Sequence, residues 1–229
     1  MIGDNVQKIL SEIAGGNAFG EKITLVAATK TRTAEEINEA IAAGIADIGE
    51  NRVQEFVEKY DAVHGAKRHF IGHLQNNKVK YLIGKCDLLH SLDRFELAEE
   101  LQKRAEKANW TAECLVEINI GSELSKSGFS FEDARAAFEK ICAQYKNIRL
   151  RGLMAMLPLS DDTAMLADLC KKMRGLFESL RDADENVQYL SMGMSGDWRL
   201  CVECGSNMIR VGTALFGPRR NLAPIAENR

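Results

Sequence analysis

The sequence predicts a parallel α/β protein, and within that class a single-domain closed (β/α)8 barrel of the TIM type that spans residues 1–229. Strand-like apolar segments alternate strictly with helical patterns, which is typical of a parallel sheet covered by helices. The alternation gives eight such units in 229 residues, and this number and length are typical of a closed barrel. An open doubly wound sheet is the alternative architecture.

The first unit comprises a helix, a strand and a second helix. Apolar residues at helical spacing over Val6–Ile13 predict the first helix. Ile23–Lys30 (ITLVAATK) is apolar on both faces of an extended chain, as expected for a strand covered on both sides. Thr33 and Glu36 form a capping-box pattern, so the second helix is expected to begin there and to end at Ala43.

The remaining seven strands are short and apolar, and each is followed by a helix or a helical remnant. The predicted strands are Ala46–Gly49, Arg68–Gly72, Cys86–Leu92, Thr111–Ile120, Ile148–Met154, Val187–Met192 and Met208–Val211. The predicted helices are Val53–Val63, Gln75–Ile83, Asp93–Ala108, Phe131–Tyr145, Asp162–Arg181 and Asp197–Cys204. Asp93 is expected to cap the long charged helix that ends at Ala108, through a capping box with Glu96.

Composition and charge exclude several functional classes. Hydrophobic residues make up 45% of the chain and charged residues 28%, as in soluble globular proteins. The net charge of −3 gives no general attraction to nucleic acids or anionic membranes. The N-terminus has no secretory-signal pattern, and no apolar run is long enough to span a bilayer. We therefore expect a cytoplasmic protein without nucleic-acid or membrane partners.

The six cysteines are scattered along the chain without a disulfide framework, which is typical of reduced thiols. Cys201 and Cys204 form one CxxC motif, but no second pair accompanies it. We expect both to be small side chains on one helix face, and we predict no metal site.

Lys30 is the candidate reactive group. It stands at the C-terminal end of a buried strand, where α/β barrels carry their chemistry. Desolvation or a neighbouring cation prepares a lysine for imine formation with a carbonyl compound, and Arg32 is a candidate for that cation. The alternative is a lysine that ends the strand by reaching into water.

The loops after the last two strands predict an anion site. TIM-type barrels bind phosphate groups in these loops, and small residues there let backbone N–H groups approach an anion. The candidate residues are Ser195, Gly196, Gly212 and Thr213. The alternative is that they serve only as turn and cap residues.

Arg210 interrupts an apolar strand, and a buried guanidinium needs hydrogen-bond acceptors. Strand alternation places it on the same face as Gly212, so it could point at the contents of the anion site. A salt bridge to a carboxylate on a neighbouring strand is the alternative. A ligand that joins the anion site to Lys30 needs a phosphate and a carbonyl group, and pyridoxal 5′-phosphate and the sugar phosphates of Schiff-base aldolases both carry them.

Seven motifs, in this order, resemble the pyridoxal phosphate homeostasis proteins (the YggS/PROSC-like family). They are LVAATKT, IGENRVQE, HFIGHLQNNK, INIGSELSKSG, RGLMAM, SMGMSGDW and IRVGTALFG, and they extend over nearly the whole chain. The resemblance implies a barrel like the N-terminal domain of alanine racemase. It also implies that pyridoxal 5′-phosphate, a vitamin B6 cofactor, is bound as a lysine imine by a protein that buffers or delivers it inside the cell.

Carried over by position, the resemblance implies a set of cofactor-binding residues. Lys30 would be the imine lysine, and Arg210 would face the pyridine nitrogen. The other members would be the phosphate-binding Ser195, Gly196, Gly212 and Thr213, with Asn51, His69 and Met192 near the ring.

The chain departs from the family pattern in two places. His73 stands where the family often has proline, and the segment after Ser195 (GDWRLCVECGSN) differs from the commoner D-D-M-E-x-A-I-x-x-G-S. Gly196 replaces the first aspartate of that pattern, so backbone donors carry more of the expected phosphate contact.

We expect a cofactor holder rather than an enzyme. Arg210 beside the pyridine nitrogen would disfavour its protonation and weaken the cofactor as an electron sink. The chain also continues only about twenty residues beyond the last strand, too few for the β domain that supplies a second base in racemases. A weakly active amino-acid racemase is the main alternative, and a lysine-imine aldolase and a pure interaction protein are two others.

The expected partners are the cofactor, small amines or amino acids, and apo-enzymes that accept the cofactor. The chain itself is expected to be monomeric. Lys126, in the loop after the fifth strand, is a candidate second amine for handover, although a solvated loop lysine is the alternative.

Overall fold

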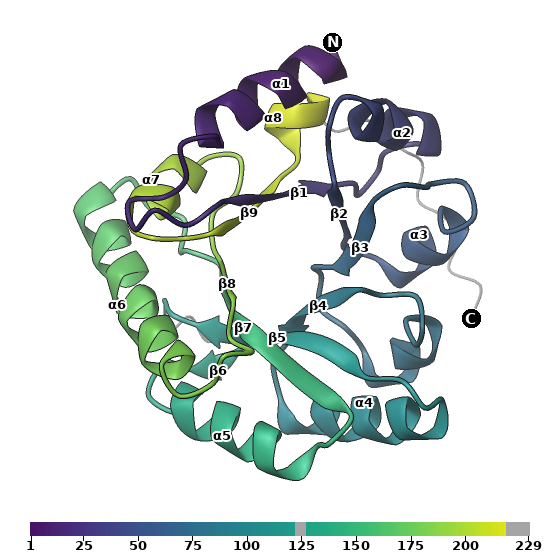
Figure 1. Ribbon diagram of the computed structural model, residues 1–229, viewed down its shortest axis with the longest axis vertical. Coiled ribbons are helices and arrows are strands. Elements are labelled where there is room, and N and C mark those ends of the chain that lie inside the picture. The colour runs from purple at the N-terminus through teal and green to yellow at the C-terminus, as the bar shows by residue number, and fades with distance from the viewer. Residues whose placement is uncertain (122–126, 219–229) are drawn as a thin grey trace.

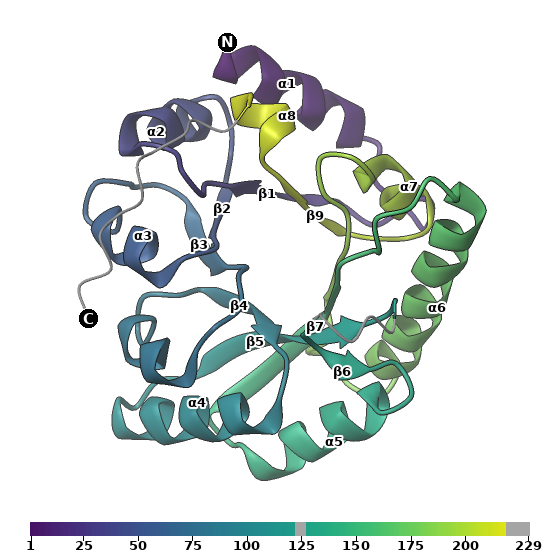
Figure 2. The same cartoon turned by 180° about the vertical axis from the view of Figure 1, so that it is seen from behind.

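The structure is a computed structural model that describes residues 1–121 and 127–218. Eight parallel strands close into a ring, which Figures 1 and 2 view along its axis from the two ends. The strands are β1 (Thr24–Ala28), β2 (Asp47–Glu50), β3 (Lys67–Phe70), β4 (Leu88–Leu92), β5 (Ala112–Asn119), β7 (Ile148–Ala155), β8 (Tyr189–Ser191) and β9 (Met208–Val211). The predicted closed barrel is therefore confirmed, and the open doubly wound sheet is not adopted.

The ring follows the order of the chain. Each strand pairs in parallel with its neighbours in sequence, β1 pairs with β9, and pairing between β4 and β5 completes the circle. One strand, β6 (Phe129–Ser130), was not predicted; it adds two residues beside the end of β5 outside the ring. All strand C-termini consequently lie at one end of the barrel, which is the end that carries Lys30.

Helices surround the ring on all sides (Figure 1). They are α1 (Ile2–Ile13), α2 (Ala34–Ala42), α3 (Val53–Glu58), α4 (Phe95–Lys107), α5 (Ala134–Gln144), α6 (Thr163–Arg181), α7 (Trp198–Glu203), α8 (Thr213–Phe216) and the 3-10 helix η1 (Asn76–Tyr81). The segment predicted as a helix over 75–83 is the 3-10 helix, and the third predicted helix is α3, which ends at Glu58, five residues earlier than expected.

One predicted helix cap is confirmed and one is wrong. Thr33 and Glu36 make both bonds of the capping box. At the start of α6 the Asp162 carboxylate accepts the N–H of Met165, a cap that was not predicted. Asp93 does not cap α4, because Arg94 occupies the N-cap position and the Asp93 carboxylate pairs with Arg94 and His73 instead.

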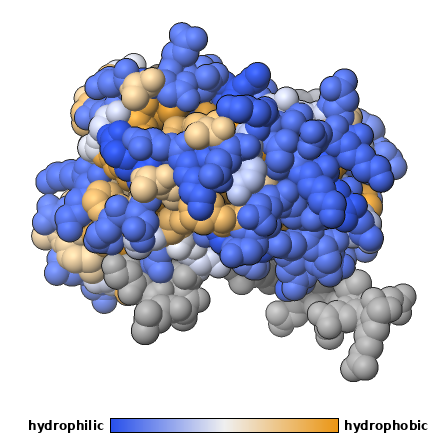
Figure 3. All heavy atoms as spheres, turned by 90° about the horizontal axis from the view of Figure 1, so that it is seen from below, coloured by the Kyte–Doolittle hydropathy of each residue, from blue (hydrophilic) through white to orange (hydrophobic). Residues whose placement is uncertain are grey.

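Most of the hydrophobic core lies between the strands and the helices. Two clusters there contain large side chains from the outward strand faces, such as Phe70 and Ile209, and from the helices. A smaller cluster, composed of Val26, Leu88, Leu115, Met154 and Met208, fills part of the barrel interior. The outer face seen in Figure 3 is mainly hydrophilic, as expected for helices that bury only one side.

Gly152 allows β7 and β8 to pair closely. Its φ is +140°, and a Cβ atom at this position would lie 1.9 Å from the carbonyl oxygen of Tyr189. The register of β7 against β5 shifts at the same level. Only glycine combines this backbone conformation with so close an approach, so this residue helps to set the curvature of the wall that carries Arg210.

Candidate functional site

Lys30 lies two residues beyond the end of β1 and is half-buried at the C-terminal end of the barrel. The next residue, Thr31, has a φ of +63°, a left-handed conformation that costs a threonine about 1–2 kcal/mol. Such strain persists only where the surroundings hold the backbone in place. The chain around Lys30 is therefore held by contacts outside the lysine itself.

A buried hydrogen-bond network supplies those contacts. The Thr29 hydroxyl donates to Glu50 Oε1 at 2.7 Å, and the N–H of Thr31 donates to Glu55 Oε2 at 2.7 Å. Lys59 joins the two sides, because its ammonium group lies 2.7 Å from both carboxylates and 3.0 Å from the Thr29 carbonyl. Side chains from β2 and α3 thus fix both residues that flank Lys30.

Three buried oxygen atoms beside this network have no hydrogen-bond partner within the described residues. They are Thr31 Oγ1, Glu50 Oε2 and Asn51 Oδ1. Burial raises the pKa of Glu50, although the adjacent Lys59 opposes that shift. Unpaired buried acceptors are costly, and here they lie on the segments next to Lys30.

The interpretation of Arg32 as a cation beside Lys30 is not supported by its contacts. Its guanidinium group donates to the carbonyl oxygens of Gly217 and Pro218 and lies 3.7 Å from the Glu36 carboxylate. It also lies over the ring of Phe216. Arg32 therefore connects α2 to the end of α8 in the helical layer.

The loops after β8 and β9 lie against each other. Ser195 Oγ accepts N–H groups from Gly212 at 3.3 Å and Ala214 at 3.4 Å. Thr213, the first residue of α8, is exposed beside them, and Gly196 is exposed with open space around it. The structure therefore brings together the four residues predicted as phosphate ligands.

Gly193 makes this arrangement possible. Its φ is +102°, and a Cβ atom would lie 2.8 Å from the Cα of Trp198. Its carbonyl accepts the N–H of Arg210 at 2.9 Å. The turn after β8 is thereby bonded to β9, so the two loops keep their relative position.

Arg210 points into the barrel below these loops, and only 5% of it is exposed. One guanidinium nitrogen, Nη1, donates to the Ser191 carbonyl at 2.9 Å and to its hydroxyl at 2.6 Å, and Nη2 donates to the Ala155 carbonyl at 3.0 Å. Burial lowers the pKa of Arg210, and the charge of Glu117 opposes the shift. Carbonyl groups at the ends of β7 and β8, rather than the salt bridge considered above, are the direct acceptors.

Glu117 is a buried carboxyl group on β5 inside the same end of the barrel. Burial and the nearby Asp93 raise its pKa to about 7, while Arg210 and Arg94 act in the opposite direction. Because the group titrates near neutral pH, it can exchange a proton under physiological conditions.

The structure does not bring two of the predicted residues to this group. Met192 is fully buried and packs with Cys201 in the cluster between strands and helices. The His69 ring lies inside the barrel, 3.0 Å from Asp47 Oδ1 and 2.8 Å from His90 Nε2. Their assignment near the cofactor ring remains an untested prediction. Asn51 directly follows Glu50, which bonds to Thr29 beside Lys30.

His73 and Cys201 lie outside this group. His73 bonds to Asp93 at 2.9 Å, and Cys201 packs 3.8 Å from Cys170 on α6. Lys126 lies outside the described residues. Within 1–121 and 127–218, no group of three His, Cys, Asp or Glu side chains could hold a metal ion.

The sequence did not predict the residues that hold the Lys30 segment and Arg210 in place through hydrogen bonds. Thr29, Glu50 and Lys59 belong to this group, as do His90 and Ser191 inside the barrel. One signal was available: Glu50 and Glu117 are acidic residues within strands that are otherwise buried, and a buried charge needs a partner. The identity of each partner depends on strand register.

The residues present fit pyridoxal phosphate in four respects. The chain offers a primary amine at Lys30 and convergent N–H groups at Gly212 and Ala214 for a phosphate. Arg210 uses three N–H groups in the bonds given above, so two of the five N–H groups of an arginine remain for a ring nitrogen. The unpaired oxygen of Asn51 could accept a ring hydroxyl.

Comparison with known proteins identifies close relatives. The family model of the alanine racemase N-terminal domain matches residues 4–220. A pyridoxal phosphate homeostasis protein from Aquifex aeolicus is 42% identical over 199 residues, 86% of this chain and 87% of its own. The Escherichia coli K12 protein of the same name is 36% identical over 204 residues, 87% of each chain.

Solved structures show the same relationship. PipY from Synechococcus elongatus PCC7942, solved with pyridoxal phosphate bound, is 31% identical and superposes with a TM-score of 0.82 over 95% of this chain and all of its own. Alanine racemase from Clostridium difficile 630 is 17% identical, with a TM-score of 0.75 over 98% of this chain and 59% of its own. The latter similarity concerns the fold alone.

Proposed function

This chain belongs to the pyridoxal phosphate homeostasis proteins, within the alanine racemase N-terminal domain family, and from that premise we propose that it holds pyridoxal phosphate reversibly through Lys30. The observation that carries the proposal is the position of Lys30 and the Ser195–Gly212 loop pair at the same end of one barrel. When bound, the cofactor supplies an aldehyde that condenses with a primary amine and a phosphate that carries negative charge.

The chain's own residues position the lysine and hold the phosphate. The Glu50–Glu55–Lys59 network fixes the backbone on both sides of Lys30. The Lys30 side chain therefore extends toward the ligand from a fixed backbone position. Backbone N–H groups of Gly212 and Ala214, now bonded to Ser195 Oγ, are the donors nearest to the expected phosphate. Hydrogen bonds hold both elements before a ligand binds, which lowers the ordering cost of binding.

Arg210 favours holding over catalysis. Its guanidinium group stays protonated and has no acceptor, so it cannot take up a proton from the ligand, and its charge opposes protonation of a ring nitrogen beside it. None of the four tyrosines offers a second base at this end of the barrel: Tyr145 and Tyr189 lie where strands begin, and Tyr60 and Tyr81 follow α3 or belong to η1. We infer that small amines and acceptor apo-enzymes remove the cofactor.

A spectrum tests the assignment of the lysine. Purified protein incubated with pyridoxal phosphate should absorb in the visible range, and borohydride reduction should leave a pyridoxyl group on the peptide that contains Lys30. The Lys30→Ala variant should lose both signals, whereas Lys80→Ala, which alters an exposed lysine of η1, should retain them. An adduct on another lysine in the wild-type chain contradicts the assignment.

A proton-exchange assay separates the holder from a weak racemase. We expect the loaded protein to leave the α-proton of alanine unexchanged in deuterated water, because no tyrosine in the described part of the chain offers a second base at this end of the barrel. Rapid exchange that depends on Lys30 would favour the racemase. Loss of the chromophore on transfer to an apo-enzyme is the positive result for delivery.

The remaining assignments follow the same proposal. We propose a monomer, since the site is assembled within one chain, and a cytoplasmic location, where apo-enzymes would be available. None of the helices in the described part of the chain is both long enough and apolar enough to cross a membrane.

A further inference from the structure

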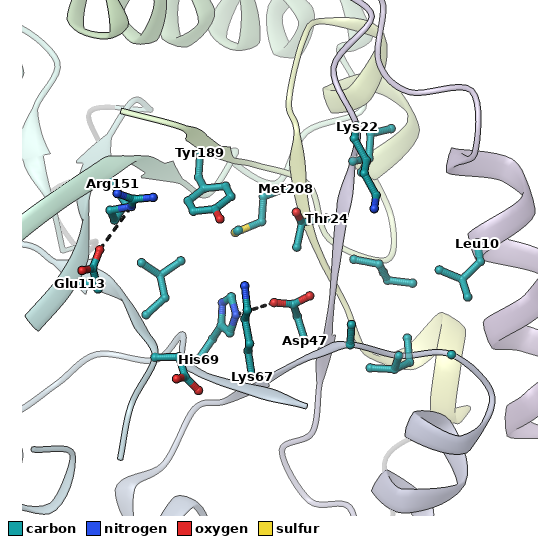
Figure 4. Close-up of a pocket in the computed structure, with 17 residues that line it drawn as sticks. Leu10, Lys22, Thr24, Asp47, Lys67, His69, Glu113, Arg151, Tyr189 and Met208 are labelled. Carbon is teal, nitrogen blue, oxygen red and sulfur yellow. Dashed lines mark hydrogen bonds and ion pairs between the residues drawn. The ribbon is translucent and has the colours of Figure 1, made fainter. Parts of the chain in front are cut away.

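A cavity of about 550 Å3 opens at the N-terminal end of the barrel, opposite the proposed cofactor site (Figure 4). Residues at or just before the starts of the strands line it, among them Lys22, Asp47, Lys67, Glu113 and Tyr189. Its volume lies within the range of roughly 300–1,000 Å3 found for small-molecule sites. The proposed function makes no use of this cavity.

Two ammonium groups in the cavity have no acceptor. Figure 4 shows the side chains of Lys22, just before β1, and Lys67, at the start of β3, directed into the same space. In the part of the chain that the structure describes, neither side chain makes an ion pair or a hydrogen bond. A ligand carboxylate or phosphate would meet both charges.

The acidic residues of the cavity, in contrast, already have partners. Asp47 Oδ1 bonds to His69 at 3.0 Å, and the Glu113 carboxylate lies 2.9 Å from Arg149 and 3.3 Å from Arg151. Asp87 accepts a backbone N–H at 2.7 Å. The lysines therefore remain the groups with unused binding capacity.

The walls between these charges suit an organic body rather than a bare ion. Leu88 and Met208 belong to the interior hydrophobic cluster and line the cavity. The hydroxyl groups of Thr24 and Tyr189 point into it (Figure 4), and no hydrogen bond is formed by either hydroxyl within the described residues. Apolar walls with a few convergent polar groups are typical of small-molecule sites.

A polar chain runs from the floor of this cavity through the barrel. Asp47 bonds to His69, His69 Nδ1 lies 2.8 Å from His90 Nε2, and His90 Nδ1 lies 3.2 Å from Ser191 Oγ. Arg210 donates to the same hydroxyl at 2.6 Å. Apolar side chains usually fill a barrel of this kind, so a continuous buried polar chain is a costly feature that links its two ends.

The donors of this chain all point in one direction. Because Arg210 can only donate, the Ser191 hydroxyl is free to donate to His90, which then donates to His69, and His69 donates to the Asp47 carboxylate. Burial, His69 and Arg210 lower the pKa of His90 well below its usual range, which agrees with a neutral ring. A change in the acceptor at Asp47 therefore changes the polarisation of every bond up to Arg210.

We propose that the N-terminal cavity is a second ligand site, for a small organic anion whose carboxylate or phosphate binds Lys22 and Lys67, and that the Asp47–His69–His90–Ser191 chain couples it to Arg210. The site itself is independent of the proposed function. Only its coupling rests on pyridoxal phosphate being bound at the opposite end.

Titration with phenyl phosphate and benzoate tests the site. Both probes carry an anionic group on an apolar ring, so the stronger binder identifies the preferred group. We expect saturable binding to the loaded protein, with shifts of the His69 imidazole NMR signals, and a loss of about tenfold in affinity for both Lys22→Ala and Lys67→Ala. Lys103→Ala, on the outer face of α4, should bind like the wild type.

Three results would overturn the site. They are the absence of saturable binding at millimolar probe, wild-type affinity in both Lys22→Ala and Lys67→Ala, and equal affinity for inorganic phosphate and phenyl phosphate, which would leave no role for the apolar walls. If the protein fails to load with pyridoxal phosphate, the proposed function fails, but titration of the unloaded Ser195→Ala variant still measures the cavity with the other anion site weakened.

Coupling has its own measurement. Probe affinity should differ at least twofold between loaded and unloaded protein, and by reciprocity the probe should change the affinity for pyridoxal phosphate by the same factor. The His69→Gln variant should abolish this factor while it still binds the probe. Equal probe affinity in the loaded and unloaded wild-type protein would refute the coupling.

Discussion

The two ends of the barrel differ in how their polar and charged groups are buried and paired, although the same strands form both. At the C-terminal end, buried acids lie in a network with unpaired oxygens, the backbone at Thr31 is strained, and the pKa of Glu117 is raised to about 7. At the N-terminal end, Glu113 has arginine partners, and the charged groups without a partner among the described residues are the exposed Lys22 and Lys67. Buried polar groups therefore lower the stability of the C-terminal end, whereas the lysines of the N-terminal end stay in contact with water.

The difference follows from what each end must hold. A site that positions one lysine needs fixed backbone and buried support, and buried charges are expensive to disturb. A cavity lined by exposed side chains costs little to leave empty. Three matched pairs of substitutions, with one member of each pair at either end, can sharpen or break this comparison.

The largest expected effect concerns two lysines. Lys59→Met should lower the free energy of unfolding by about 3–5 kcal/mol, because it leaves the Glu50 and Glu55 carboxylates buried without their cation. Lys67→Met at the other end should change it by less than about 0.5 kcal/mol, since Lys67 is exposed and has no ion pair among the described residues. Urea unfolding of both variants measures the difference.

A second substitution distinguishes charge from packing. Adding Glu50→Gln to Lys59→Met should restore part of the lost stability, because it removes one of the two uncompensated charges. No recovery would show that the lysine acts by packing alone, and the comparison of the two ends would then lose its electrostatic basis.

The next effect concerns two glutamates of β5. The pKa of Glu117 is raised from 4.5 to about 7 in the folded chain, so the folded state binds its proton more tightly than the unfolded state. That stabilisation is fully present below pH 4.5 and is lost as the pH rises through about 7. Wild-type protein should therefore lose about 2–3 kcal/mol between pH 5 and pH 8 that Glu117→Gln does not lose.

Glu113→Gln provides the control on the same strand. This substitution removes a carboxylate held by Arg149 and Arg151 and leaves Glu117 in place, so the loss between the two pH values should persist. Urea unfolding curves at both pH values decide the matter, and identical pH dependence in Glu117→Gln and wild type would argue against a protonated Glu117.

The smallest effect concerns the backbone. Thr31 and Asn109 are the two non-glycine residues with positive φ in the described chain, at +63° and +48°. Thr31→Gly should raise the free energy of unfolding by up to about 1 kcal/mol, because glycine relieves the strain at a smaller cost in chain entropy. Asn109→Gly should change it by only a few tenths, since asparagine tolerates this conformation. Thermal unfolding measures both variants. A Thr31→Gly variant that is less stable than the wild type would mean that the Thr31 backbone is not strained.

Local rules were sufficient for most of the architecture. Apolar periodicity and the capping box at Thr33 located the helices and strands to within a few residues. This works because the spacing of apolar side chains along the chain differs between helices and strands. The cap at Asp93 failed for a tertiary reason: Arg94 and His73 compete for that carboxylate. The two-residue strand β6 carries too little pattern to be detected.

The sequence by itself determined the barrel, the strand end that carries Lys30, and the two glycine- and serine-containing loops, since each depends on residue order or on nearby neighbours. Only the tertiary structure decided that Lys59 supports Lys30, that Arg210 bonds to Ser191 and Ala155, and that His69 belongs to a chain that reaches the opposite end. These contacts join residues far apart in the chain, and their partners are selected by strand register around a closed ring, which no local pattern encodes.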